Sequence, residues 1–99
     1  MLFLVISTPR AEQPSSMRGR QKAYWVWLNE RIQEGKVKHL WNKTGRGAVV
    51  IADVPSNEEL HKFINQWQEL VPATFEVTPL VSKEHQERIA NAGTNPMQL

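Results

Sequence analysis

The feature that most constrains this 99-residue sequence is a pair of apolar, β-branched runs at residues 2–7 and 48–54. Neither run alternates regularly between apolar and polar residues, so a strand formed by either would be largely apolar on both faces. A chain of this length forms a single domain and can build few layers. We therefore expect a small sheet with helices over one face and a hydrophobic surface on the other.

The intervening segments predict two amphipathic helices. The first is expected from about residue 17 to Gly35, because a glycine closes a helix cheaply in a left-handed conformation. The second should begin after Ser56, with Glu59 three residues further on to complete a capping box. Its apolar stripe continues to Trp67.

Three further segments complete the predicted sheet. Residues 37–43 and 48–54 should pair as a hairpin across the turn at Thr44–Gly47. Residues 73–81 form the last strand, in which Pro79 belongs at an edge or at the strand end because it cannot donate to a ladder. The resulting order is βαββαβ, a ferredoxin-like sandwich of the α+β class.

We assign residues 1–81 to this domain and residues 82–99 to a polar helix, Ser82–Ala90, followed by a tail. Two helices can cover only one face of a four-stranded sheet. The open face would then expose a large apolar surface, and such surfaces mark interfaces. We expect a homodimer, or a higher homo-oligomer, in which the sheets stack face to face.

Composition excludes several classes of site. The chain has no cysteine, and His39, His61 and His85 lack metal-ligand spacing, so we expect neither a metal nor another cofactor. Basic residues are dispersed, with nine in the first fifty positions against three acids, which favours a solvated face or an anionic small molecule over nucleic acid. The apolar start is too short for a signal peptide or a membrane span, so we expect a cytoplasmic protein.

Three aromatic residues fall within four positions of the first helix. Tyr24 and Trp25 lie on the predicted apolar stripe with Leu28, where they fill the core or form the wall of a pocket for a flat ligand. Trp27 and Val26 lie off that stripe. We expect this second pair to contact another subunit.

The strand at residues 37–43 carries a histidine beside an aromatic residue. Alternation places Val37, His39 and Trp41 on one face and Leu40 on the other. His39 is either a hydrogen-bonded structural residue or a group that titrates near neutral pH. Trp41 is a third candidate for the wall of an aromatic pocket.

Four short segments resemble the muconolactone delta-isomerase family, in the same order and at nearly the same spacing. They are MLF at the start, EGKVKHLW at residues 34–41, DVPS at 53–56 and EELH at 58–61. The resemblance covers residues 1–81. It implies a dimeric α+β barrel that assembles into a ring-like oligomer. It also implies cofactor-free proton transfer that shifts a double bond in a small lactone during bacterial catechol breakdown.

The same resemblance implies a catalytic glutamate on the first helix and a histidine after the hairpin glycine. These positions are Tyr24 or Trp25 and Arg46 in this chain. Neither aromatic side chain is a suitable acid or base near neutral pH, and an arginine keeps its proton. His39 then becomes the first choice for a general base, while Arg46 and, secondarily, Lys22 are candidates to bind a ligand carboxylate.

Three functions remain open. The first is a cofactor-free isomerase, or a related enzyme acting on a small unsaturated lactone or conjugated acid. The second is a non-catalytic binder of a small conjugated anion, with Tyr24, Trp25 and Trp41 as its wall. The third is an oligomeric structural or regulatory module whose aromatic residues serve only assembly.

Overall fold

The computed structural model describes residues 1–10 and 14–92, with the backbone alone at residues 14–18. The elements follow the predicted βαββαβ order, with one further helix after the last strand. They are β1 (Leu2–Pro9), α1 (Pro14–Gln33), β2 (Val37–Asn42), β3 (Ala48–Asp53), α2 (Asn57–Leu70), β4 (Ala73–Leu80) and α3 (Lys83–Asn91). The predicted α+β class and ferredoxin-like order are confirmed.

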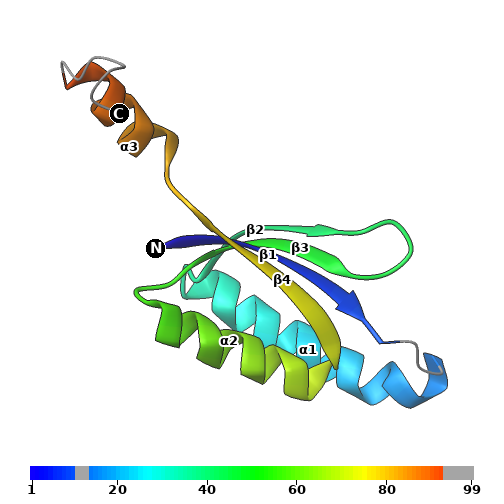
Figure 1. Ribbon diagram of the computed structural model, residues 1–99. Helices are drawn as coiled ribbons and strands as arrows, with labels where there is room; N and C mark the ends of the chain where they lie inside the picture. The colour runs from blue at the N-terminus through cyan, green and yellow to red at the C-terminus, as the bar shows by residue number, and fades with distance from the viewer. Residues whose placement is uncertain (11–13, 93–99) are drawn as a thin grey trace.

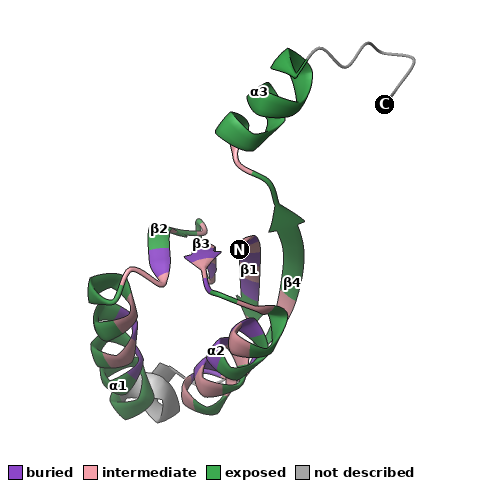
Figure 2. Ribbon diagram, turned by 90° about the vertical axis from the view of Figure 1, so that its left-hand side faces the viewer, coloured by how far each residue is buried: buried purple, intermediate pink, exposed green. Residues whose placement is uncertain are grey.

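The four strands form one antiparallel sheet in the order β2-β3-β1-β4, and α1 and α2 lie side by side on one of its faces (Figures 1 and 2). Alternate residues of β1 and β3 point into the layer beneath the helices. The inward residues are buried: Phe3, Val5, Ser7, Ala48, Val50 and Ala52. Pro79 lies on β4, which is an edge strand as predicted.

Local signals set the start of α2 and both ends of α1. The hydroxyl of Ser56 accepts a hydrogen bond from the amide of Glu59 at 3.1 Å, as the capping box predicts. Gly35 follows α1 with φ of 79°, the left-handed conformation expected there. Helix α1 begins at Pro14, earlier than predicted. Proline suits the first helical position because it lacks a backbone N–H, and an N–H at that position would have no acceptor within the helix.

The buried side of α1 is rotated from the predicted stripe. Tyr24 and Leu28 are buried as expected, but Trp25 is 42% exposed. Trp27 packs instead against α2, with its ring 5.1 Å from that of Phe63, and its Nε1 donates to Gln66 at 3.1 Å. Trp27 therefore does not lie on an outer face of the helix as expected, and its contact with another subunit stays a prediction.

The physical reason is that α1 has two neighbours within the chain. It packs against the sheet and also against α2, so its buried sector is wider than a single sheet contact would require. The indole of Trp27 fills the groove between the two helices. Val26 remains 55% exposed, and its assignment to a subunit contact stays a prediction.

A β-bulge in β2 changes which residues share a face. Val37 pairs with Ala52, whereas His39, two positions later, already pairs with the next residue of β3, Ile51. The extra residue reverses the alternation. Val37 is therefore buried toward the helices and Leu40 packs against the same core, while His39 and Trp41 face away. The prediction that Val37 shares a face with them is wrong.

Beyond the edge of the sheet, β4 continues into α3, which projects away from the body of the molecule (Figure 1). Helix α3 begins after Ser82, whose hydroxyl accepts a hydrogen bond from the amide of His85 at 3.1 Å. It contains no buried residue. The helix predicted at residues 82–90 is thus present and extends to Asn91. The predicted tail is residues 91–99, of which 93–99 lie outside the described residues.

Candidate functional site

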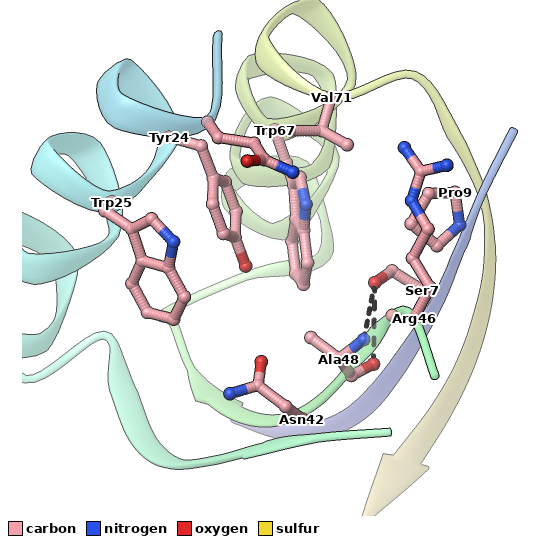
Figure 3. A pocket seen from close by; sticks show the side chains of 11 residues that line it. Ser7, Pro9, Tyr24, Trp25, Asn42, Arg46, Ala48, Trp67 and Val71 are labelled. Atoms are coloured by element: carbon pink, nitrogen blue, oxygen red, sulfur yellow. Dashed lines mark hydrogen bonds between the residues drawn. The ribbon is translucent and has the colours of Figure 1, made fainter. Parts of the chain in front are cut away.

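A cavity of ≈ 200 Å³ opens between α1, the C-terminal end of α2 and the end of the sheet where β2 and β3 are joined (Figure 3). Elements from both layers therefore supply its walls. Six lining residues carry the chemistry discussed below: Ser7, Tyr24, Trp25, Asn42, Arg46 and Trp67.

The helical side of the cavity is aromatic. Tyr24 and Trp25, adjacent on α1, stand edge to face with their ring centroids 5.4 Å apart. Trp67 of α2 lies behind Tyr24 at 5.8 Å. Figure 3 shows these rings along one side of the cavity, with the phenol hydroxyl directed toward the sheet. Such walls favour a flat ligand, which can stack on or abut the ring faces.

The phenol of Tyr24 keeps its proton over the physiological pH range and is therefore a hydrogen-bond donor. Only 9% of the residue is exposed, and burial raises the pKa of Tyr24 from its ordinary value of 10.0 to about 12. Desolvation disfavours the charged phenolate, so the neutral form persists. This side chain can donate a hydrogen bond to a ligand oxygen, but it cannot act as a base near neutral pH.

The opposite side of the cavity is polar and cationic. Arg46 lies in the β2–β3 hairpin, and its side chain runs past Ser7 toward Pro9, across the cavity from Trp25 (Figure 3). A guanidinium presents several donors in a fixed fork that matches a carboxylate. Asn42, at the end of β2, adds an amide group near Tyr24. The two sides together suit a flat molecule with an anionic end.

Ser7 is a buried polar residue in this wall, with an exposed fraction of 2%. It occupies an inward position of β1, and its hydroxyl accepts a hydrogen bond from the amide of Ala48 at 3.1 Å. The return contact from the hydroxyl to the carbonyl of Ala48 is long, 3.5 Å. At this end of the β1–β3 pairing, the hydroxyl of Ser7 therefore serves as the acceptor for the backbone amide of Ala48.

The structure brings together three of the predicted site residues, Tyr24, Trp25 and Arg46. It does not bring His39 or Trp41 to the cavity. Their rings stack on each other on the open face of the sheet, with centroids 5.5 Å apart. Lys22 is exposed on α1 and does not line the cavity.

Sequence reasoning missed the other lining residues, of which four have polar or aromatic side chains: Ser7, Gln21, Asn42 and Trp67. Trp67 was assigned only to the core stripe of α2, and nothing local indicates that one edge of its ring reaches a cavity. Ser7 carried a usable signal, since a polar residue at an inward strand position needs a partner.

Among the described residues that line the cavity there is no aspartate, glutamate or histidine. In the described part of the chain, no cluster of three or more such residues could hold a metal ion. No helix within the described residues is long and apolar enough to cross a membrane.

Two solved structures share this fold. Muconolactone isomerase, known from a crystal structure, is 31% identical over 83% of this chain and 90% of that chain, with a TM-score of 0.62. The 5-chloro-2-hydroxyhydroquinone dehydrochlorinase TftG from Burkholderia phenoliruptrix AC1100, in complex with 2,5-dihydroxybenzoquinone, is 23% identical over 86% and 98% of the two chains, with a TM-score of 0.58. The second likeness concerns the fold alone. No curated protein matches the sequence.

The resemblance stated above is thus confirmed at the level of the fold, which is that of the muconolactone isomerase-like superfamily. A family model described as a domain of unknown function, DUF3303, matches residues 1–93. That match spans the sheet, the three helices and the whole cavity. The chain therefore belongs to the DUF3303 family and has a muconolactone isomerase-like fold.

Proposed function

We propose that this protein binds a small, flat, conjugated carboxylate in the cavity between α1 and the β2–β3 hairpin. The observation that carries the proposal is the division of the cavity into an aromatic side and a cationic side, with no carboxylate or imidazole among the described residues that line it. Tyr24 and Trp25 form the surface for the conjugated part. Arg46 pairs with the carboxylate.

The protonation states of the cavity support an anionic ligand. A guanidinium is charged at any physiological pH, and the phenol of Tyr24 keeps its proton because burial raises its pKa to about 12. Both groups donate hydrogen bonds. A carboxylate or an enolate-like oxygen supplies the acceptors that these donors need, whereas a cationic ligand would meet repulsion from Arg46.

Binding is tested with the purified protein, benzoate as the probe and tryptophan fluorescence as the signal, supported by calorimetry. Trp25 and Trp67 both line the cavity, so an occupying ring should change their emission. Arg46→Gln should weaken benzoate binding by about tenfold or more, since it removes a charge-assisted hydrogen bond. Lys22→Gln is the matched control, because it removes an exposed cation outside the cavity.

No response of the wild-type protein to benzoate, or to a wider panel of aromatic acids and lactones, would refute the proposal. Equal weakening by Arg46→Gln and Lys22→Gln would also refute it. That result would mean that overall charge, and not a placed guanidinium, attracts the anion.

A second candidate is a cofactor-free isomerase or related enzyme acting on a small unsaturated lactone. It is favoured by the 31% identity to muconolactone isomerase, and by the fact that the positions where the resemblance implies catalytic residues, Tyr24 or Trp25 and Arg46, all line one cavity. The position of His39 argues against it, since this residue lies on the opposite face of the sheet and the described lining holds no other imidazole and no carboxylate.

Ultraviolet-monitored turnover of muconolactone separates the two candidates. Conversion that is lost in Arg46→Gln and retained in His39→Ala would establish the enzyme. Binding without conversion would leave the first proposal alone.

We further propose that two copies stack through the open face of the sheet. This face carries partly buried apolar residues on the central strands, Leu4, Ile6, Val49 and Ile51, and Trp41 at 57% exposure. Dimerisation would remove this apolar surface from water. Trp41→Lys should shift the protein to smaller species in sedimentation, while Lys22→Gln should not. An unchanged assembly state would refute this interface.

A further inference from the structure

The cationic side of the cavity depends on a short loop. Residues 43–47 join β2 to β3, and the amide of Lys43 donates to the carbonyl of Gly47 at 2.9 Å. Both glycines of the loop, Gly45 and Gly47, have positive φ, 92° and 117°. These conformations suit glycine and strain other residues. The loop therefore has a defined turn that carries Arg46 at its end.

The side chain of Lys43 ties this loop to the central strand. Its Nζ donates to the Oγ1 of Thr8 on β1 at 2.9 Å, with a longer contact of 3.5 Å to the carbonyl of Ser7. The aliphatic part of the lysine lies over Gly47, because a Cβ on that glycine would be 3.0 Å from the lysine Cδ. The same Cβ would be only 2.5 Å from the carbonyl of Ser7.

Arg46 has no such tie of its own. It is exposed, and within the described residues its guanidinium forms no ion pair or hydrogen bond. The position of Arg46 is consequently set by the backbone of the loop and by what holds that loop against β1. Two polar side-chain contacts do so: the one from Lys43 to Thr8 within the loop, and the one between Ser7 and Ala48 immediately after it.

We infer that Lys43, through its hydrogen bond to Thr8, is a positioning residue that holds Arg46 at the cavity and thereby sets the selectivity for carboxylates over neutral ligands. The inference rests on the proposed function. Its chemical content is that fixing the loop backbone that carries Arg46 removes part of the ordering cost of binding. Lys43 does not line the cavity, so it acts through Arg46.

The test compares two probes of nearly equal size and shape, benzoate and benzamide, by calorimetry. The ratio of the benzamide to the benzoate dissociation constant measures carboxylate selectivity. A general loosening of the cavity would weaken both ligands alike and would leave this ratio unchanged. Lys43→Met and Thr8→Val should each lower the ratio by about 3- to 10-fold, the range expected for loss of one hydrogen bond. Lys43→Arg, which can still donate to Thr8, should restore most of the ratio.

Two controls separate positioning from other roles. Thr8→Val removes the tie but leaves the charge of Lys43 in place, so its effect cannot come from a lost cation. Thr74→Val removes a hydroxyl that donates to the carbonyl of Thr8 at 3.3 Å from the β4 side, away from the hairpin. It should leave the ratio unchanged.

The outcomes are distinct. If Arg46→Gln abolishes selectivity while Lys43→Met and Thr8→Val retain it, the inference is overturned and the proposed function stands. An effect of Lys43→Met without one of Thr8→Val also overturns it, because the charge would then act directly. If the wild-type protein does not prefer benzoate, the proposed function fails and the inference fails with it.

Discussion

Tyr24 is the only tyrosine of the chain, so its ionisation can be measured directly. The phenol is buried between α1, α2 and the sheet, and this burial raises the pKa of Tyr24 from 10.0 to about 12. In the unfolded chain the phenol is solvated and titrates near its ordinary value. Raising the pH through this interval should therefore destabilise the fold through one identified group.

The sign follows from the direction of the shift. Because the folded protein favours the neutral phenol, the contribution of Tyr24 to stability is fully present below pH 10 and is lost as the pH rises toward 12. One pKa unit corresponds to about 1.36 kcal/mol, so a shift of about two units is worth up to about 2.7 kcal/mol. The hydroxyl opens onto the cavity, which makes this figure an upper bound.

Two measurements check the prediction. The tyrosinate absorbance of the native protein should rise with a midpoint near pH 12, and that of the unfolded protein near pH 10. Denaturant unfolding across the same interval should show the wild-type protein losing stability faster than Tyr24→Phe, in which all other titrating groups are unchanged. A native midpoint near 10, or parallel stability curves for the two proteins, would refute the burial argument.

Three other substitutions test the fold and the site. Trp27→Ala should lower the free energy of unfolding by about 3–5 kcal/mol, because the indole fills the groove between α1 and α2, and should leave the sedimentation of the folded protein unchanged. Gly47→Ala should lower the unfolding free energy by more than about 1 kcal/mol and by more than Gly45→Ala, since both have positive φ but only Gly47 meets the carbonyl of Ser7 at 2.5 Å. Trp25→Ala should weaken benzoate binding by roughly tenfold in a fluorescence titration, with less than about 1 kcal/mol change in stability, because 42% of this residue is exposed.

The order of elements could be predicted because its signals are local. A capping box at Ser56, a closing glycine at Gly35 and apolar runs without alternation each depend on a few neighbouring residues. They predicted the helices, the strands and the covered face of the sheet before any tertiary contact was known.

What sequence reasoning missed depended on tertiary geometry. The bulge between Val37 and His39 adds one residue to β2 and reverses its faces, yet the alternating pattern reads the same with or without it. Trp27 was assigned outward because the helix was considered against the sheet alone. Its burial requires knowing that α2 lies beside α1 on the same face.

The residues that line the cavity could be predicted only in part. Arg46 lies 21 positions after the adjacent pair Tyr24 and Trp25, and only the resemblance singled out these positions as a group. Trp67 and Ser7 joined them once α2 and β1 were placed. The fold therefore determines the shape of the cavity and which positions of the chain line it, whereas the side chains at those positions determine its chemistry.

A site that catalyses a double-bond shift by proton transfer must meet two requirements. One is a set of donors for the enolate-like charge, and the other is a side chain that carries the proton. Tyr24 and Arg46 are both donors that keep their protons at neutral pH, so the first requirement is met. None of the lining residues that the structure describes meets the second. Donors that keep their protons favour the binding of an anion, which is the function proposed for this cavity.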